Sequence, residues 1–150
     1  FVPVGYRPPA EQTDEEYPLV LITGRSLYHY HTGTMTRKTS GLNQLRGEEL
    51  LEVNPEDAAR LGISEGSAVR VSSRRGQVVL RATLSTGVPR GAVFMTFHFR
   101  EARANLLTNP ALDPLSKIPE LKRCAVRVEP AAEEELPSFE GEASLDELFD

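Results

Sequence analysis

The chain is poor in the residues that make crosslinks and nucleophiles. It holds one cysteine among 150 residues, so Cys124 has no partner for an internal disulfide or a cysteine-only metal site. Cys124 lies in the alternating run 122–128, where it shares one strand face with Val126 and Val128, a pattern typical of core filler. The alternative, a thiol activated by its basic neighbours, requires exposure to solvent.

Long apolar runs are missing as well. No stretch approaches the roughly 20 residues that cross a bilayer, and no signal-peptide pattern is visible. We therefore expect no membrane insertion and a cytoplasmic location. The first residue is Phe1 and not Met, so we expect either a piece of a longer chain or a processed N-terminus.

Catalytic motifs are the third absence. There is no Gly-x-Ser-x-Gly elbow, no Gly-Lys-Ser/Thr ending of a phosphate loop, and no carboxylate pair placed for acid–base work. The sequence therefore predicts no catalytic residue in this chain and indicates a binding domain.

Charge is distributed unevenly along the chain. The net charge is −5, yet residues 131–150 hold eight acids and no base, which leaves 17 basic and 14 acidic residues in 1–130. A mildly basic body suits a phosphate-bearing ligand but is too weak for nucleic acid, which we do not expect as a partner. The acidic tail, 131–150, is predicted to be disordered, with a docking turn at 145–149 as the alternative.

Short strands dominate the region between the two ends. Residues 1–17, with three prolines, indicate an incoming linker. A helix is predicted over 54–62, because Asn54 suits the N-cap, Pro55 the first turn and Gly62 the C-terminal stop. A helical turn is expected at 41–45, and Gly76 is expected in a left-handed position of the hairpin turn at 73–76. Strands are expected at 19–23, 50–53, 68–73, 77–84, 92–97 and 124–128, a pattern that suggests a nearly closed barrel.

The segment 22–37 directly follows the first strand and carries most of the polar chemistry. It contains glycines, hydroxyls, two arginines and the pair His29 and His31, which suit a polar, anionic ligand. Two imidazoles on one strand face could reach a metal ion, but no third ligand is evident nearby. We therefore predict no metal site and expect the histidines to hydrogen-bond a ligand or the backbone.

A second cluster lies in residues 97–109. Phe97 and Phe99 are either core residues or an aromatic surface for a ring such as a purine or pterin, and Asn105 and Asn109 are either caps or amide donors. Lys122 precedes the last strand, where its charge could reach the same ligand.

Several of these motifs together resemble a known family. They are Thr23-Gly24-Arg25, His29 to Arg37, Glu52 to Ala58, Val71 to Gly76, Val93 to Phe99, Ala104 to Asn109 and Lys122 to Val126. In this order they resemble the C-terminal dinucleotide-binding domain of the molybdopterin oxidoreductases, over residues 18–130. Within that family the chain looks most like the formate dehydrogenase catalytic (alpha) subunit, and nitrate reductases carry similar signatures.

The resemblance implies a mainly β fold, a double-psi β-barrel with one or two short helices. It implies bis(molybdopterin guanine dinucleotide) with Mo or W as the cofactor, the metal ligand being supplied by another domain. The other domains of the catalytic subunit are then partners, with electron-transfer subunits as further candidates. The implied cofactor-binding residues are Thr23, Gly24, Arg25, Ser26, Leu27, His29, His31, Thr32, Gly33, Phe97, Asn105 and Lys122.

Three functional hypotheses follow. The first is a cofactor-binding domain of a formate dehydrogenase, which moves two electrons between formate and carbon dioxide, with no turnover by the isolated chain. The second is a nitrate reductase-type member of the same family. The third is a barrel that serves as an interaction module without a cofactor.

Overall fold

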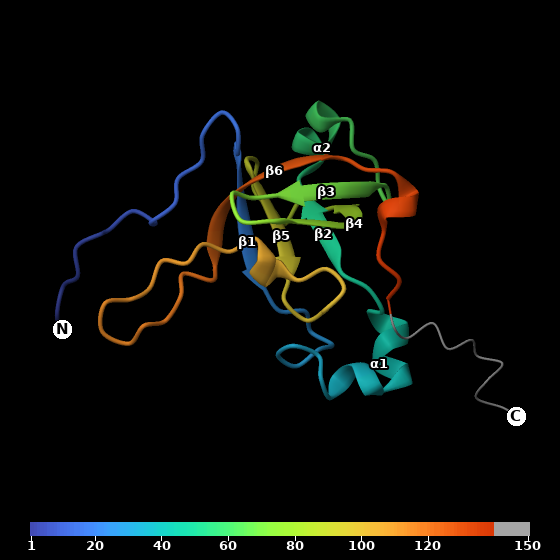
Figure 1. Cartoon of the computed structure of the whole chain (residues 1–150), viewed down its shortest axis with the longest axis horizontal. Helices are drawn as coiled ribbons and strands as arrows, with labels where there is room; N and C mark the ends of the chain where they lie inside the picture. Colours follow the sequence, from blue (N-terminus) through green and yellow to red (C-terminus); the bar gives the residue numbers. More distant parts are fainter. Residues whose placement is uncertain (140–150) are drawn as a thin grey trace, which may run out of the picture.

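Six strands close into a barrel in the computed structural model, which describes residues 1–139 (Figure 1). The strands are β1 (Leu19–Gly24), β2 (Leu50–Val53), β3 (Ala68–Ser72), β4 (Gln77–Leu84), β5 (Ala92–Thr96) and β6 (Arg123–Pro130). Around the barrel their order is β1-β5-β2-β4-β3-β6, and the pairs β1–β5 and β2–β4 are parallel. Each parallel pair joins strands that are not consecutive in the chain. The predicted double-psi β-barrel is confirmed.

Alternating side chains of the strands fill the barrel. Leu19 and Leu21 of β1, Val69 and Val71 of β3 and Leu80 of β4 are almost completely buried, as period-two strands with one inner face require. Cys124 belongs to the same cluster, and burial raises the pKa of its thiol to about 11. Core filler is therefore the structural role of Cys124.

Two short α-helices flank the barrel, α1 (Ser40–Leu45) and α2 (Pro55–Leu61). The α2 boundaries are as predicted: Asn54 Oδ1 accepts from the Glu56 N–H at 3.0 Å, and Gly62 ends the helix with φ 70°. The 3-10 turns are η1 (Thr36–Lys38), η2 (Ala104–Leu106) and η3 (Glu133–Glu135). None of the helices within residues 1–139 has the length and apolarity needed to cross a membrane.

The β3–β4 hairpin is confirmed, but the prediction for Gly76 is wrong. Among residues 1–139 the glycines with positive φ are Gly33, Gly62, Gly66 and Gly91. A Cβ on Gly76 would lie 3.0 Å from the Leu106 carbonyl oxygen. Glycine is thus needed at residue 76 for the close approach of η2 and not for a left-handed turn.

The segments before and after the barrel are tied to it by ion pairs. In the arm 1–17, Glu11 accepts from Arg74 and Arg75 at 2.6 and 2.8 Å. After β6, Glu133 pairs with Arg81 at 2.9 Å, and Phe139 meets Phe99 edge-on. Residues 131–139 thus follow a defined path in a region where disorder was predicted, because these pairs hold them to the barrel. Residues 140–150, including the candidate docking turn at 145–149, lie outside the described residues.

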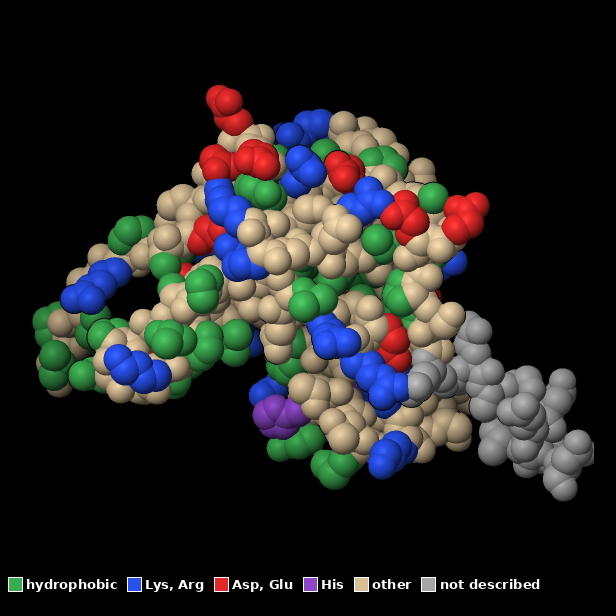
Figure 2. Space-filling view, viewed as in Figure 1, with side chains coloured by type: hydrophobic (Ala, Val, Ile, Leu, Met, Phe, Trp, Pro, Cys, Tyr) green, Lys and Arg blue, Asp and Glu red, His purple; other side chains and the backbone are tan. Residues whose placement is uncertain are grey.

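A long loop between η2 and β6 projects from the barrel beside the N-terminal arm (Figure 1). We call residues 110–122 the apolar finger. Asp113 Oδ1 accepts from the backbone N–H groups of Leu115 and Ser116. Leu112 and Pro119 form an isolated antiparallel β-bridge. Large apolar side chains cover the finger and the arm (Figure 2), and Leu115 is 92% exposed.

Candidate functional site

The parallel pairing of β1 and β5 brings two loops to one end of the barrel. Gly24 at the end of β1 pairs with Thr96 at the end of β5, and neighbouring parallel strands end at the same edge of a sheet. The β1 loop (residues 25–35) and the β5 loop (residues 97–103) therefore begin side by side. Most of the predicted site residues belong to these two loops.

Phe97 is the centre of a cationic cluster at this edge. Arg25 Cζ lies 5.8 Å and Lys122 Nζ 5.2 Å from the centroid of the Phe97 ring. Lys122 Nζ also donates to the Thr23 carbonyl oxygen at 3.5 Å, and Thr23 Oγ1 donates to the Leu121 carbonyl oxygen at 2.6 Å. These bonds hold the base of the apolar finger against the end of β1 and bring two positive charges to one aromatic ring.

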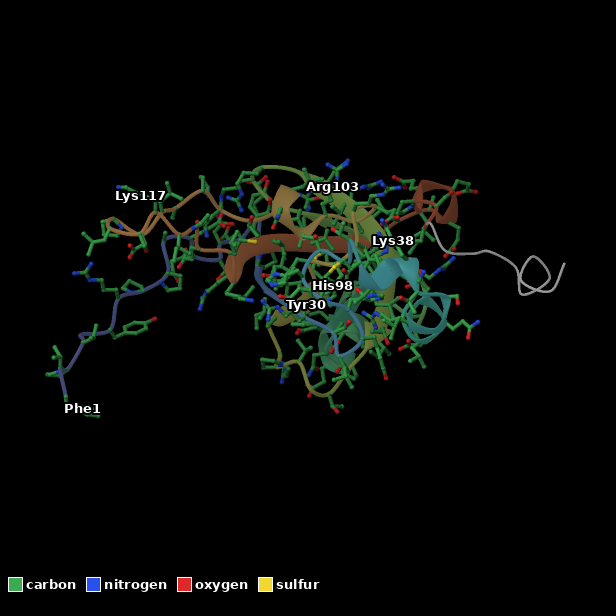
Figure 3. The ribbon with its side chains drawn as sticks, turned by 90° about the horizontal axis from the view of Figure 1, so that it is seen from below. Phe1, Tyr30, Lys38, His98, Arg103 and Lys117 are labelled. Atoms are coloured by element: carbon green, nitrogen blue, oxygen red, sulfur yellow. The ribbon has the colours of Figure 1, made fainter. Side chains whose placement is uncertain are left out.

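A cavity of about 150 Å³ adjoins the cluster. Thr32, Phe97 and Asn105, all predicted site residues, line it together with Arg100 and Arg103. The two arginines were missed by sequence reasoning, although their position just after a strand at the site edge was a usable signal. His98 and Arg103 line the same cavity, and Figure 3 shows Lys117 far from Arg103, Tyr30 and His98, out on the apolar finger.

The backbone N–H of Ser26 is hydrogen-bonded, whereas its side-chain hydroxyl is not. Its backbone N–H donates to His98 Nε2 at 2.8 Å. Its Oγ is buried and finds no hydrogen-bond partner among residues 1–139. A buried hydroxyl normally has a partner, so Ser26 Oγ is suited to a group that the chain itself does not supply.

The two histidines of the β1 loop lie in different environments. His29 is buried, with Nδ1 3.0 Å from Thr36 Oγ1 and Nε2 2.7 Å from the Arg46 carbonyl oxygen. His31 is exposed and stacks edge-on against Tyr30. The shared strand face on which the metal alternative depended does not form, since residues 25–35 contain no strand. Within the described residues no group of three His, Cys, Asp or Glu is placed to hold a metal ion.

The remaining predicted residues differ in how close they come to the cluster. Gly24 ends β1 and faces the Phe94 ring, and Gly33 is buried with φ 73°. Leu27 is 92% exposed, and Asn105 is exposed and lines the cavity. Both ring nitrogens of His29 are hydrogen-bonded inside the chain, to Thr36 and Arg46. The ring therefore has no nitrogen left for a ligand.

Comparison with known proteins gives a consistent result. Residues 19–125 match the model of the Molydopterin dinucleotide binding domain. The chain is 52% identical over 127 residues to the F420-dependent formate dehydrogenase subunit alpha of Methanocaldococcus jannaschii, covering 85% of this chain and 19% of that protein. It is 50% identical over 126 residues to subunit alpha of F420-dependent formate dehydrogenase 1 of Methanococcus maripaludis, covering 84% of this chain and 19% of that protein.

A relative with another name has a comparable sequence identity. A nitrate reductase of Symbiobacterium thermophilum is 50% identical over 130 residues, covering 84% of this chain and 17% of that protein. Among solved structures, acetylene hydratase from Pelobacter acetylenicus superposes with a TM-score of 0.74 at 17% identity, over 85% of this chain and 21% of that chain. That likeness concerns the fold alone. The chain spans about a fifth of the length of these relatives.

Proposed function

The chain belongs to the molybdopterin dinucleotide-binding domain family, and from this premise we propose that its parallel-strand edge holds a molybdopterin guanine dinucleotide. Arg25 and Lys122 would face the phosphates, because cations at an aromatic ring offer both charge and a flat surface. Phe97 would contact a ring of the cofactor. The Ser26 hydroxyl would give its unused hydrogen bond to the ligand.

One observation supports this proposal most directly. The buried Ser26 Oγ, unpartnered within residues 1–139, belongs to the loop that Arg25 joins to Phe97. The donor set is a hydroxyl, cations and an aromatic face, which suits a diphosphate joined to heterocycles. When bound, the cofactor supplies two-electron chemistry at Mo or W, whose protein ligand belongs to another domain; this chain binds and orients it.

We further propose formate as the substrate of the whole enzyme. Relatives named as formate dehydrogenase alpha subunits are 50–52% identical to this chain. A nitrate reductase role is the second candidate, favoured by the relative that is 50% identical under that name. The residues of this domain face a dinucleotide and not the substrate, so the same binding edge suits both reactions.

The partner we propose is the rest of the catalytic subunit, with electron-transfer subunits beyond it, in a cytoplasmic enzyme. The apolar finger supports the first part. Leu115 and Ile118 are 92% and 63% exposed on a loop whose path is fixed by Asp113. An ordered apolar projection of this kind is typical of a surface that another domain covers. The alternative, an interaction module without cofactor, provides no hydrogen-bond partner for the buried Ser26 hydroxyl.

Calorimetric titration of the chain with guanosine diphosphate tests the binding proposal. We expect Lys122→Ala and Phe97→Ala to weaken binding about tenfold each, the value of one cation contact or ring contact. Arg90→Ala is the matched control, because Arg90 is exposed and precedes β5 at the opposite end of that strand. Equal affinity for all four proteins, or no binding by the wild type, would contradict the proposal.

A further inference from the structure

His98 is the residue on which the β1 loop is built, although no ligand role is proposed for it. Its side chain is buried, with 1% of the residue exposed. One ring nitrogen, Nε2, accepts from the Ser26 N–H at 2.8 Å, and the other, Nδ1, contacts the His31 carbonyl oxygen. A single imidazole therefore ties together two points of the loop that are five residues apart.

The two bonds define the protonation state of the ring. A backbone N–H only donates, so Nε2 holds a lone pair, and a carbonyl only accepts, so Nδ1 carries the hydrogen. Only the neutral Nδ1–H tautomer makes both bonds. Burial lowers the pKa of His98, and the nearby His29, Arg46 and Arg25 lower it further against the effect of the His31 carbonyl.

The loop backbone has positive φ angles at His31 and again two residues later, at Gly33. His31 has φ 48°, a left-handed conformation that is uncommon for residues with a side chain, although His takes it more often than most. Gly33 has φ 73°, and a Cβ there would lie 3.0 Å from the His98 carbonyl oxygen. The loop thus passes over His98 at three places, and the bond to the His31 carbonyl offsets the strain at His31.

The bond to Ser26 has a direct consequence for the site. It fixes the backbone at Ser26, and through it the position of the buried Oγ that has no partner within residues 1–139. Arg25, the preceding residue, is the one whose guanidinium lies at Phe97. A turn of the Ser26 peptide would move both groups.

We propose that His98 is a positioning residue: its neutral Nδ1–H tautomer holds the β1 loop in the conformation that presents Arg25 and the Ser26 hydroxyl to the ligand. The ligand side of this inference rests on the proposed function, whereas the loop side does not. His98 itself donates nothing to the ligand, since both of its nitrogens are used within the chain.

Three substitutions separate the two bonds. His98→Gln keeps an acceptor near the Nε2 position, His98→Asn keeps a donor near Nδ1, and His98→Phe keeps the ring and loses both bonds. Met95→Leu is the control, because Met95 is fully buried in β5 and its replacement conserves volume. Amide hydrogen exchange at Ser26, global unfolding and the dissociation constant for guanosine diphosphate are measured for each variant.

We expect the Ser26 amide of His98→Phe to exchange about tenfold faster than in the wild type, the effect of one lost hydrogen bond. In His98→Gln that protection returns, whereas in His98→Asn it does not. The control changes global stability without a selective effect at Ser26. Affinity for guanosine diphosphate follows the Ser26 protection across the series. Unchanged exchange at Ser26 in His98→Phe would overturn the proposal, as would equal behaviour of the Gln and Asn variants.

The tautomer of the His98 imidazole can be measured independently of these variants. Long-range proton–nitrogen spectra of His98 are expected to show a neutral imidazole protonated at Nδ1 at pH 7. A ring protonated at Nε2 would overturn the assignment. If the wild type shows the expected tautomer and exchange pattern but binds no nucleotide, the proposed function fails while the loop-positioning role stands.

Discussion

Glu49 is a buried carboxyl group directly beneath the functional edge. It is 0% exposed, accepts from the Thr96 N–H at 2.9 Å and from Thr96 Oγ1 at 2.5 Å, and lies 4.0 Å from Arg46. Burial raises its pKa to about 7, and the bonds from Thr96 only partly offset this. Glu49 therefore joins the end of β5 to the segment before β2, and its raised pKa makes the stability of the fold depend on pH.

Removing the charge of Glu49 should flatten that dependence. The folded-state pKa of Glu49, about 7, lies above the ordinary glutamate value of 4.5, so the contribution of Glu49 to stability is complete below pH 4.5 and is lost as pH rises through 7. The free energy of unfolding should fall by roughly 3 kcal/mol over this window. Glu49→Gln should lack this fall, because an amide does not titrate in this range; its oxygen can accept from the Thr96 N–H while its nitrogen donates to Thr96 Oγ1. Urea titrations between pH 4.5 and 8 measure it, with the exposed Glu56→Gln as control; parallel profiles for all three proteins would refute the assignment.

Gly33 offers a second test with one residue. At φ 73° any side chain costs about 1–2 kcal/mol, and an added Cβ would also lie 2.6 Å from Arg37 Cδ. Gly62→Ala is the matched control, because Gly62 has φ 70° and nothing within 4 Å of the added Cβ. Both variants should lose stability in chemical denaturation, but only Gly33→Ala should lose affinity for guanosine diphosphate. Similar affinity losses in both would show that strain alone matters.

Among the elements, α2 and its cap depend on one amide side chain. Asn54 Oδ1 accepts from the Glu56 N–H at 3.0 Å while Nδ2 donates to the Val88 carbonyl oxygen at 2.8 Å. Asn54→Ala should cost about 1–2 kcal/mol, and Asn54→Ser should recover part of it by restoring the cap without the Val88 bond. Thermal unfolding of the three proteins measures this order. Equal stability of the Ala and Ser variants would show that the cap contributes nothing.

Some elements of the fold could be predicted from the sequence alone, and some residue roles could not. The strands and α2 were predictable because alternation, Asn54 and Gly62 act locally in the chain. The role of His98 was not, since it depends on β1 and β5 being parallel neighbours across some 70 residues. Gly76 was misread for the same reason: its neighbour, the Leu106 carbonyl, is distant in sequence.

At the scale of the whole molecule, the exposed side chains of the apolar finger are not expected to contribute to the stability of the barrel. Leu115→Ser with Ile118→Ser should leave the unfolding temperature of the chain unchanged, because both side chains are exposed. The same pair should abolish association with the remaining domains of the subunit in a co-expression pull-down. Leu45→Ser, 61% exposed on α1, is the control and should associate normally. Full association of the double variant would remove the finger from the interface.

The central claim is that the end of the barrel where β1 and β5 meet binds a dinucleotide. Titration of the isotope-labelled chain with guanosine diphosphate, followed by amide chemical shifts, tests it most directly. We predict saturable shifts in residues 23–33, at Phe97 and at Lys122, with β3, β4 and α2 unchanged. Shifts confined to residues 131–139 and the tail that follows, or none at all in the β1 loop at millimolar nucleotide, would contradict the claim.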